Sequence, residues 1–224
     1  MLMCILSKAL VELTVRYQKG GMRNMRPIGR DSFTRDYWNY YLMLERKFVD
    51  ALAYVELAPT NFSTYSNEFA HLLQAIGAEL DSVFKLYCGF KAEDNKNMRD
   101  YSTYILGANG YSGIVSQSVN AREYGVSFMP FENWDTATPT WWRAYAHVKH
   151  QRADSKEEAT LKNTLYVLGA LYLMESKCFL ELSKGEDAPD IPDNPSAIFE
   201  LPGWKSKWMS FGHGTFLESI TDAD

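Results

Sequence analysis

Cysteine is scarce in this 224-residue sequence and gives no sign of a metal site or a disulfide framework. The three cysteines, Cys4, Cys88 and Cys178, are far apart, and no CxxC pair or Cys/His quartet occurs. Structural zinc sites and disulfide-stapled secreted domains need closer or more numerous cysteines. We therefore expect free, buried thiols in a reducing compartment, which favours a cytoplasmic protein.

Long apolar runs are also missing. No stretch approaches the roughly 20 apolar residues that a membrane-spanning helix needs, so no membrane partner is expected. The segment Met1–Leu6 is apolar, but it is followed by the charged residues Lys8 and Glu12. No cleavage site of small residues follows it, so the sequence does not predict a signal peptide. Residues 1–30 are expected to form a loosely attached extension.

An excess of basic charge is absent as well. There are 23 Lys and Arg residues against 28 Asp and Glu, a net charge of −5. This balance argues against a protein that coats nucleic acid or anionic membrane by bulk charge, but it leaves room for a local basic patch. Apolar residues make up 46% of the chain, which excludes wholesale disorder.

What is present is mostly helical periodicity. Apolar residues recur every three or four positions from Tyr37 to Val55, with Ser32 as the expected cap and Pro59 as the stop. A second amphipathic helix is predicted from Phe69 to Tyr87. The 63–66 stretch would cap its start, and Gly89 stands where a C-terminal glycine belongs.

The middle of the chain predicts a small β insertion at about 110–130. Two short strands, Ile114–Val119 and Tyr124–Met129, flank a turn at Asn120–Arg122 and suggest a hairpin. A short helix is expected at Met98–Leu106, and Pro130 and Pro139 bracket a loop.

The last predicted helix is apolar on most sides and is expected at the centre of a bundle. Ser155 and Glu158 match a capping box at its start, and it runs to about Leu182. The proline-rich tail, 183–224, is expected to pack on the bundle through Phe199, Trp204, Trp208 and Phe211. The fold class predicted is mainly α: an antiparallel helical bundle over 31–182, with a hairpin insertion and an irregular tail.

The segment Trp141–Arg152 holds the residues best suited to chemistry. At about 100° per residue, Arg143, His147 and His150 fall within roughly 60° of one another on a helix. The apolar side chains point the other way, so one stripe would present a guanidinium and two imidazoles. Those apolar residues are Trp141, Trp142, Tyr145 and Val148.

Such a stripe suits metal-independent cleavage of RNA. Histidine can give or take a proton near neutral pH, and arginine presents a fork of donors that fits phosphate. One imidazole would help the ribose 2′-hydroxyl attack the adjacent phosphate, leaving a 2′,3′-cyclic phosphate. DNA lacks that hydroxyl and cannot react this way.

Simpler interpretations stay open. A short basic helix with histidines is more often a solvated surface than a catalytic one. The i,i+3 pair of His147 and His150 has the spacing of metal ligands, but no third ligand is adjacent and nearby cations disfavour a divalent ion. The sequence therefore predicts no metal and no cofactor. His71 and His213 are isolated and are interpreted as structural.

The segment resembles the HEPN superfamily, whose hallmark is an arginine followed four to six residues later by a histidine. Arg143 and His150 match, with six residues between them. The wider resemblance, to a group of uncharacterised bacterial HEPN-like proteins, covers about Tyr37 to Leu182. It rests on Pro130-Phe131, Trp134, the Trp141-Trp142 pair, Val148-Lys149-His150, Arg152, Ala159-Thr160-Leu161, Gly77 to Asp81 and Lys85.

This resemblance implies a compact helical bundle, often dimeric and often a metal-independent ribonuclease of toxin–antitoxin or antiphage systems. Arg143 would be the transition-state cation and His150 the general acid or base, and the Arg143/His150 stripes of two copies would meet in one cleft. An antitoxin or regulatory protein would be a further partner. The remaining supporting residues expected are His147, Lys149, Arg152, Tyr145, Glu79 and Asp81, the two acids orienting a histidine or an arginine.

Two other functions compete with this hypothesis. One is a non-catalytic HEPN-like module that binds RNA, a nucleotide or a protein, favoured by the net charge of −5 and by Ala144, where the family usually has a polar residue. The other is a structural helical bundle whose aromatic tail mediates assembly.

Overall fold

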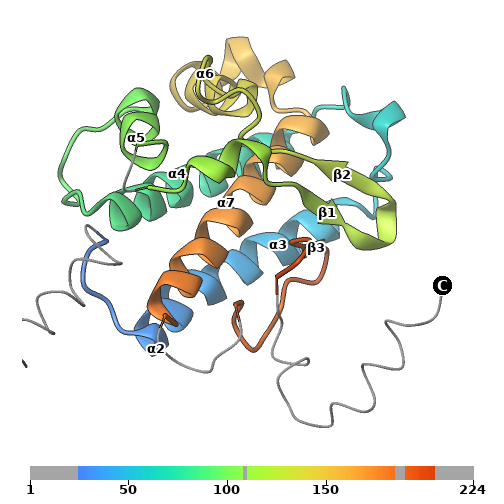
Figure 1. Cartoon of the computed structure of the whole chain (residues 1–224). Coiled ribbons are helices and arrows are strands. Elements are labelled where there is room, and N and C mark those ends of the chain that lie inside the picture. The colour runs from blue at the N-terminus through green and yellow to red at the C-terminus, as the bar shows by residue number, and fades with distance from the viewer. Residues whose placement is uncertain (1–24, 108–109, 185–189, 205–224) are drawn as a thin grey trace, which may run out of the picture.

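The computed structural model describes residues 25–107, 110–184 and 190–204 (Figure 1). Several sequence predictions fall outside these ranges: most of the N-terminal extension with Cys4, and the tail residues Trp208, Phe211 and His213. Within the described part the chain is mainly helical with one small sheet, as predicted. None of the described helices is long and apolar enough to cross a membrane.

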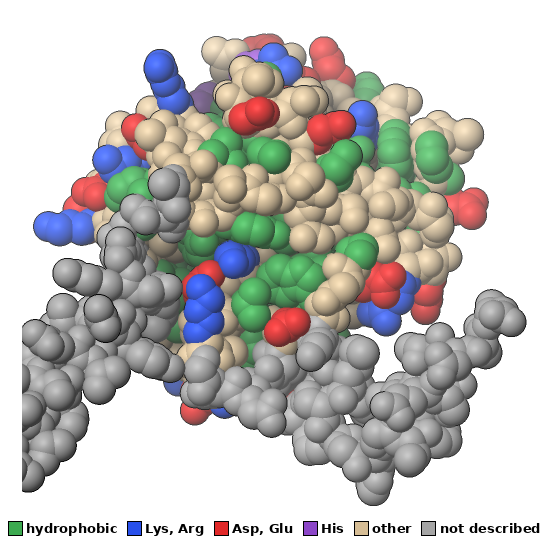
Figure 2. All heavy atoms as spheres, viewed as in Figure 1, with side chains coloured by type: hydrophobic (Ala, Val, Ile, Leu, Met, Phe, Trp, Pro, Cys, Tyr) green, Lys and Arg blue, Asp and Glu red, His purple; other side chains and the backbone are tan. Residues whose placement is uncertain are grey.

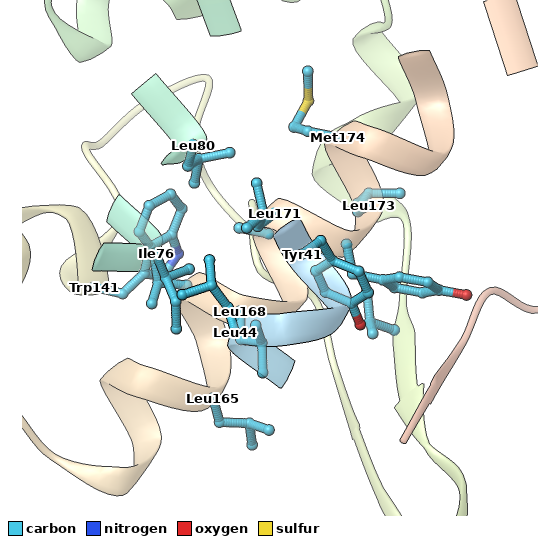
Figure 3. Close-up of a cluster of buried hydrophobic side chains, with 14 of the residues drawn as sticks. Tyr41, Leu44, Ile76, Leu80, Trp141, Leu165, Leu168, Leu171, Leu173 and Met174 are labelled. Carbon is cyan, nitrogen blue, oxygen red and sulfur yellow. The ribbon is translucent and has the colours of Figure 1, made fainter. Parts of the chain in front are cut away.

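Helix α7 (Leu161–Leu182) is the centre of the bundle, as its all-round apolar sequence predicts. It packs against α2 (Arg30–Phe33), α3 (Asn39–Ala51), α4 (Asn67–Cys88) and α6 (Thr140–Ser155). In the core, side chains of α3, α4 and α6 meet those of α7 (Figure 3). The fully buried set there includes Tyr41, Leu44, Ile76, Leu80, Leu165, Leu168, Leu171, Leu173 and Met174.

The first helical segment begins earlier and ends earlier than the sequence predicts. It runs from Arg30 through a π-helical turn, η1 (Thr34–Trp38), into α3. The predicted cap at Ser32 is therefore wrong. Ser32 lies inside α2, whose N-cap is Gly29, and just after it Phe33 and Tyr37 stack along the helical segment with ring centroids 5.3 Å apart. The helix ends at Ala51, well before Pro59.

Helix α4 forms as predicted, because its end signals are local. The Ser66 hydroxyl accepts a hydrogen bond from the Phe69 backbone N–H at 3.0 Å, which caps the start. Gly89 ends it with φ +71°, a conformation that favours glycine. The short helix α5 (Met98–Ile105) also follows the prediction.

The hairpin is confirmed, but the sheet gains a strand from the tail. Strand β1 (Val119–Ala121) pairs with β2 (Val126–Phe128) and, on its other edge, with β3 (Phe199–Glu200), both antiparallel. The first predicted strand lies too early, since Ser112–Ser116 forms a 3₁₀ helix, η3. Ile114 in this turn is fully buried, so its side chain fills the core rather than a sheet face.

A buried carboxylate holds the described part of the tail on the bundle. Glu45 on α3 accepts hydrogen bonds from the hydroxyls of Tyr41 and Ser196 and from the Ala197 backbone N–H, the last at 2.8 Å. The Trp38 indole N–H donates to the Asn194 carbonyl at 2.7 Å. We call this set of contacts the Glu45 clasp. The prediction that the tail packs on the bundle is confirmed for residues 190–204.

The predicted capping box at the start of α7 is wrong. Ser155 is the last residue of α6, and a 3₁₀ turn, η5 (Lys156–Glu158), follows it. Thr160 caps α7 instead, its hydroxyl accepting from the Asn163 backbone N–H at 3.1 Å. The side chain of Glu158 is thereby left free for a different contact.

Candidate functional site

Helix α6 divides into a buried and an exposed face, as the periodicity of its sequence predicts. Trp141, Tyr145 and Val148 are buried, and Trp141 lies beside Ile76 and Leu80 of α4 (Figure 3). Arg143, His147, Lys149, His150 and Arg152 are exposed. Figure 2 shows histidine, basic and acidic side chains gathered at this end of the molecule. We call the three residues Arg143, His147 and His150 the α6 face.

Tyr145 lies on the buried side of α6, where the helical periodicity placed it, and it can support the face only by packing beneath it. Its side chain is 4% exposed because its ring lies on Gly77 of α4, where there is no side chain to hold the helices apart. Its outer contact is with the Lys149 ammonium, 5.4 Å from the ring centroid. The tyrosine is a packing residue that sets the distance between helices α6 and α4.

The regular part of α6 ends at His150. Gln151 has φ −142° and ψ 51°, which breaks the helix before its last residues. The carbonyl groups at a helix C-terminus carry partial negative charge, and cations near them are stabilised. Lys149, His150 and Arg152 lie at this break, so the helix terminus itself helps to hold positive charge there.

His147 has a partner that the sequence did not predict. Its Nδ1 lies 2.8 Å and 3.0 Å from the two carboxylate oxygens of Glu158. The contact forms because the chain reverses direction in η5, between α6 and α7. Residue spacing gave no signal of it, since Glu158 was assigned to a capping box.

The two acids on α4 that were expected to orient a histidine or an arginine have other neighbours among the described residues. Asp81 accepts a hydrogen bond from the Tyr101 hydroxyl at 2.7 Å and forms an ion pair with Lys85 at 3.0 Å. The Lys85 contact is an i,i+4 pair along α4. It also shows why Asp81 is unavailable to α6.

Glu79 lies beside another buried acid instead. Burial raises the pKa of Glu79 to about 7. Glu175 on α7 is fully buried, and within the described part of the chain neither of its carboxyl oxygens has a hydrogen-bond partner. Burial, and then the nearby Glu79 carboxyl, raise the pKa of Glu175 well above its ordinary range. Both groups therefore keep a proton to higher pH in the folded protein than an exposed glutamate does.

Other candidate groups lie apart from the α6 face. His71 on α4 is exposed and lies 3.8 Å from Glu68, an i,i+3 pair at the helix surface. Cys88 and Cys178 are free and buried, as predicted. Within the described ranges no group of three or more His, Cys, Asp or Glu side chains is arranged to hold a metal ion.

No protein-family model, curated protein or solved structure matches this chain. The chemistry of the site must therefore be argued from its own residues. The α6 face provides one guanidinium and two imidazoles on a rigid helix, and a carboxylate fixes one of the imidazoles. These groups can bind a phosphate and move a proton.

Proposed function

We propose that this protein is a metal-independent endoribonuclease whose active site is built on the α6 face. The observation that carries this proposal is the joint exposure of Arg143, His147 and His150 on a helix whose opposite face is locked into the core. A rigid helix presents such groups with little loss of entropy on binding.

The roles follow from the chemistry of each group. The Arg143 guanidinium would bind the scissile phosphate and stabilise the charge that builds on it in the transition state. His150 would act as general acid or base. Lys149 and Arg152 would contact neighbouring phosphates, which position an RNA strand without reading its sequence.

The resemblance to HEPN proteins supports the same activity and extends it. We propose a cytoplasmic protein of a bacterial defence or toxin type, restrained by an antitoxin or other regulatory protein. We also propose that it acts as a homodimer. His150 lies seven positions after Arg143, about 10 Å along the helix axis, which is long for one phosphate to bridge. A second copy would bring an arginine and a histidine closer together.

Incubating the purified protein with total RNA in excess EDTA tests the activity. We expect fragments ending in 2′,3′-cyclic phosphate, and a loss of at least about 100-fold in rate for Arg143→Ala and for His150→Ala. Arg46→Ala and His71→Ala are matched controls, since both side chains are exposed on other helices, and they should cleave normally. Intact RNA with the wild-type protein would refute the proposal.

Mixing the two inactive variants tests the dimer. If the site takes its arginine from one copy and its histidine from the other, a mixture of Arg143→Ala and His150→Ala chains forms heterodimers with one complete site. We expect activity to return to a sizeable fraction of the wild-type rate after mixing and re-equilibration. No recovery, with the dimer confirmed by light scattering, would place both groups of the site in one copy.

RNA binding without cleavage is the second candidate function. Ala144, directly after Arg143, is 1% exposed, so this position adds no polar group to the α6 face. A binding module would retain RNA in a gel-shift assay while leaving it intact in the assay above. Its affinity would fall with salt, because each phosphate contact releases counterions.

A further inference from the structure

The contact between His147 and Glu158 is arranged as a proton-transfer pair. Both oxygens of the carboxylate lie within 3.0 Å of Nδ1, while the histidine side chain remains 58% exposed. The bonded nitrogen is Nδ1. Nε2 lies on the opposite side of the imidazole ring.

The partner determines which nitrogen carries the proton. An ionised carboxylate only accepts hydrogen bonds, so Nδ1 must be the donor. In the neutral imidazole the other nitrogen, Nε2, is then bare and able to accept a proton. A carboxylate that fixes the tautomer of a histidine in this way prepares it to act as a base.

Glu158 is itself held in place. The Asn163 side-chain amide donates to the Glu158 carbonyl at 2.8 Å. Just beyond it, the Leu161 backbone N–H donates to the Thr64 carbonyl at 2.8 Å, which fixes the start of α7 to the loop before α4. The carboxylate therefore approaches His147 from a constrained turn rather than from a free surface side chain.

His147 is also the central residue of the α6 face. It follows Arg143 by four positions and precedes His150 by three, and residues at these spacings have Cβ atoms about 5–6 Å apart on a helix. A phosphate bound by the Arg143 guanidinium would lie within one helical turn of His147. His150 is one turn further on, at the end of the regular helix.

We propose that His147 is the general base of the ribonuclease and that Glu158 is its positioning residue, an inference that rests on the proposed function. Nε2 of His147 takes the proton of the ribose 2′-hydroxyl as the 2′-oxygen forms its bond to phosphorus. The bond from phosphorus to the 5′-oxygen breaks, and protonated His150 gives that oxygen its proton. The products are a 2′,3′-cyclic phosphate and a 5′-hydroxyl, and solvent returns the two histidines to their starting states.

Cleavage of an RNA pool of random sequence, in EDTA, measures both roles. We expect His147→Asn to lower the rate by about 10²- to 10⁴-fold and Glu158→Ala by about 10- to 100-fold. His71→Asn and Glu157→Ala are matched controls, because both side chains are exposed and neither belongs to the pair; they should stay within twofold of wild type. The acidic limb of the pH–rate profile should disappear in His147→Asn.

The tautomer of His147 gives a readout that does not depend on activity. Long-range ¹H–¹⁵N spectra of wild-type protein above neutral pH should show the proton on Nδ1, and Glu158→Ala should lose this preference while Glu157→Ala keeps it. An unchanged tautomer in Glu158→Ala would overturn the role of Glu158. Normal cleavage by His147→Asn would overturn the base assignment.

These failures differ from failure of the proposed function. If wild-type protein leaves the RNA intact, the ribonuclease proposal falls and the base assignment falls with it. If wild-type protein cleaves and His150→Ala is inactive but His147→Asn is not, only the assignment of His147 is refuted.

Discussion

The ring of Tyr145 on α6 lies directly on Gly77 of α4. A Cβ atom at position 77 would sit 2.4 Å from Cδ2 of Tyr145, closer than side-chain atoms ever approach. The glycine is therefore what lets the two helices come together, and the tyrosine fills the space that it leaves. Through this contact α4 sets the position of the α6 face.

Replacing this glycine should destabilise the protein. We expect Gly77→Ala to lower the free energy of unfolding by about 1–3 kcal/mol, although alanine is otherwise favoured over glycine in a helix by about 1 kcal/mol. Gly29→Ala is the matched control: a Cβ there meets nothing within 4 Å, and the cost should stay below about 1 kcal/mol. Urea denaturation measures both. An unchanged free energy of unfolding for Gly77→Ala would show that α6 can move away from α4 without loss of stability.

The Glu45 clasp should be needed to hold the tail. We expect Glu45→Ala to cost about 2–4 kcal/mol of stability, because it leaves the buried Ser196 hydroxyl and the Ala197 N–H without their acceptor. Residues 190–204 should also become more sensitive to proteolysis. Asp50→Ala removes an exposed carboxylate from the same helix and should change neither property. Equal proteolysis of the two variants would contradict the clasp.

The acid pair of Glu79 and Glu175 should make stability depend on pH. The pKa of Glu79 is raised to about 7 in the folded state, so the folded protein binds a proton more tightly than the unfolded chain. Its contribution to stability should fall as pH rises from about 4.5 to about 7 and then level off. Glu175 acts in the same direction, because burial also raises its pKa.

Removing the Glu79 charge isolates this effect. We expect Glu79→Gln to flatten the stability curve over that range, by on the order of 1–2 kcal/mol given the partial exposure of Glu79. Glu68→Gln, an exposed acid on the same helix, should leave the slope unchanged. Urea titrations at a series of pH values measure it. A Glu79→Gln slope equal to that of wild type would contradict the assignment.

The indole of Trp141 should anchor the loop before α6. Its N–H donates to the buried Pro130 carbonyl at 2.7 Å. Trp141→Phe keeps a ring but removes the donor, and we expect a cost of about 2 kcal/mol together with faster amide exchange in the 131–139 loop. Trp142→Phe, at a partly exposed neighbour, should cost less. Equal losses of stability in the two variants would show that the Trp141 hydrogen bond adds no stability beyond that of ring packing.

Sequence predicted the parts of the fold whose causes are local. The cap at Ser66, the glycine at Gly89 and the apolar sequence of α7 each act within a few residues, and all three predictions are confirmed. Ser155 failed because Thr160, five residues on, competes for the same role. The pairing of Phe199 with Ala121 was not predicted, because nothing in either segment indicates the other.

In the candidate site, too, local features were predicted from the sequence and long-range contacts were not. Helical periodicity was enough to predict that Arg143 and His147 share an exposed face. It was not enough to predict that Glu158 returns to His147, because that contact depends on a chain reversal. The burial of Glu175 was equally hidden, since a glutamate is almost never fully buried without a partner.

The Glu45 clasp also gives the protein a late step in its synthesis. Helix α3 is synthesised early, whereas the Ser196 and Ala197 donors to the Glu45 carboxyl come near the end of the chain. A nascent chain that ends before position 196 leaves Glu45 with only the Tyr41 hydroxyl of this set. The hydrogen bonds of α3 are therefore completed only after most of the polypeptide has been synthesised. Chains truncated before position 196 cannot form the Glu45 clasp.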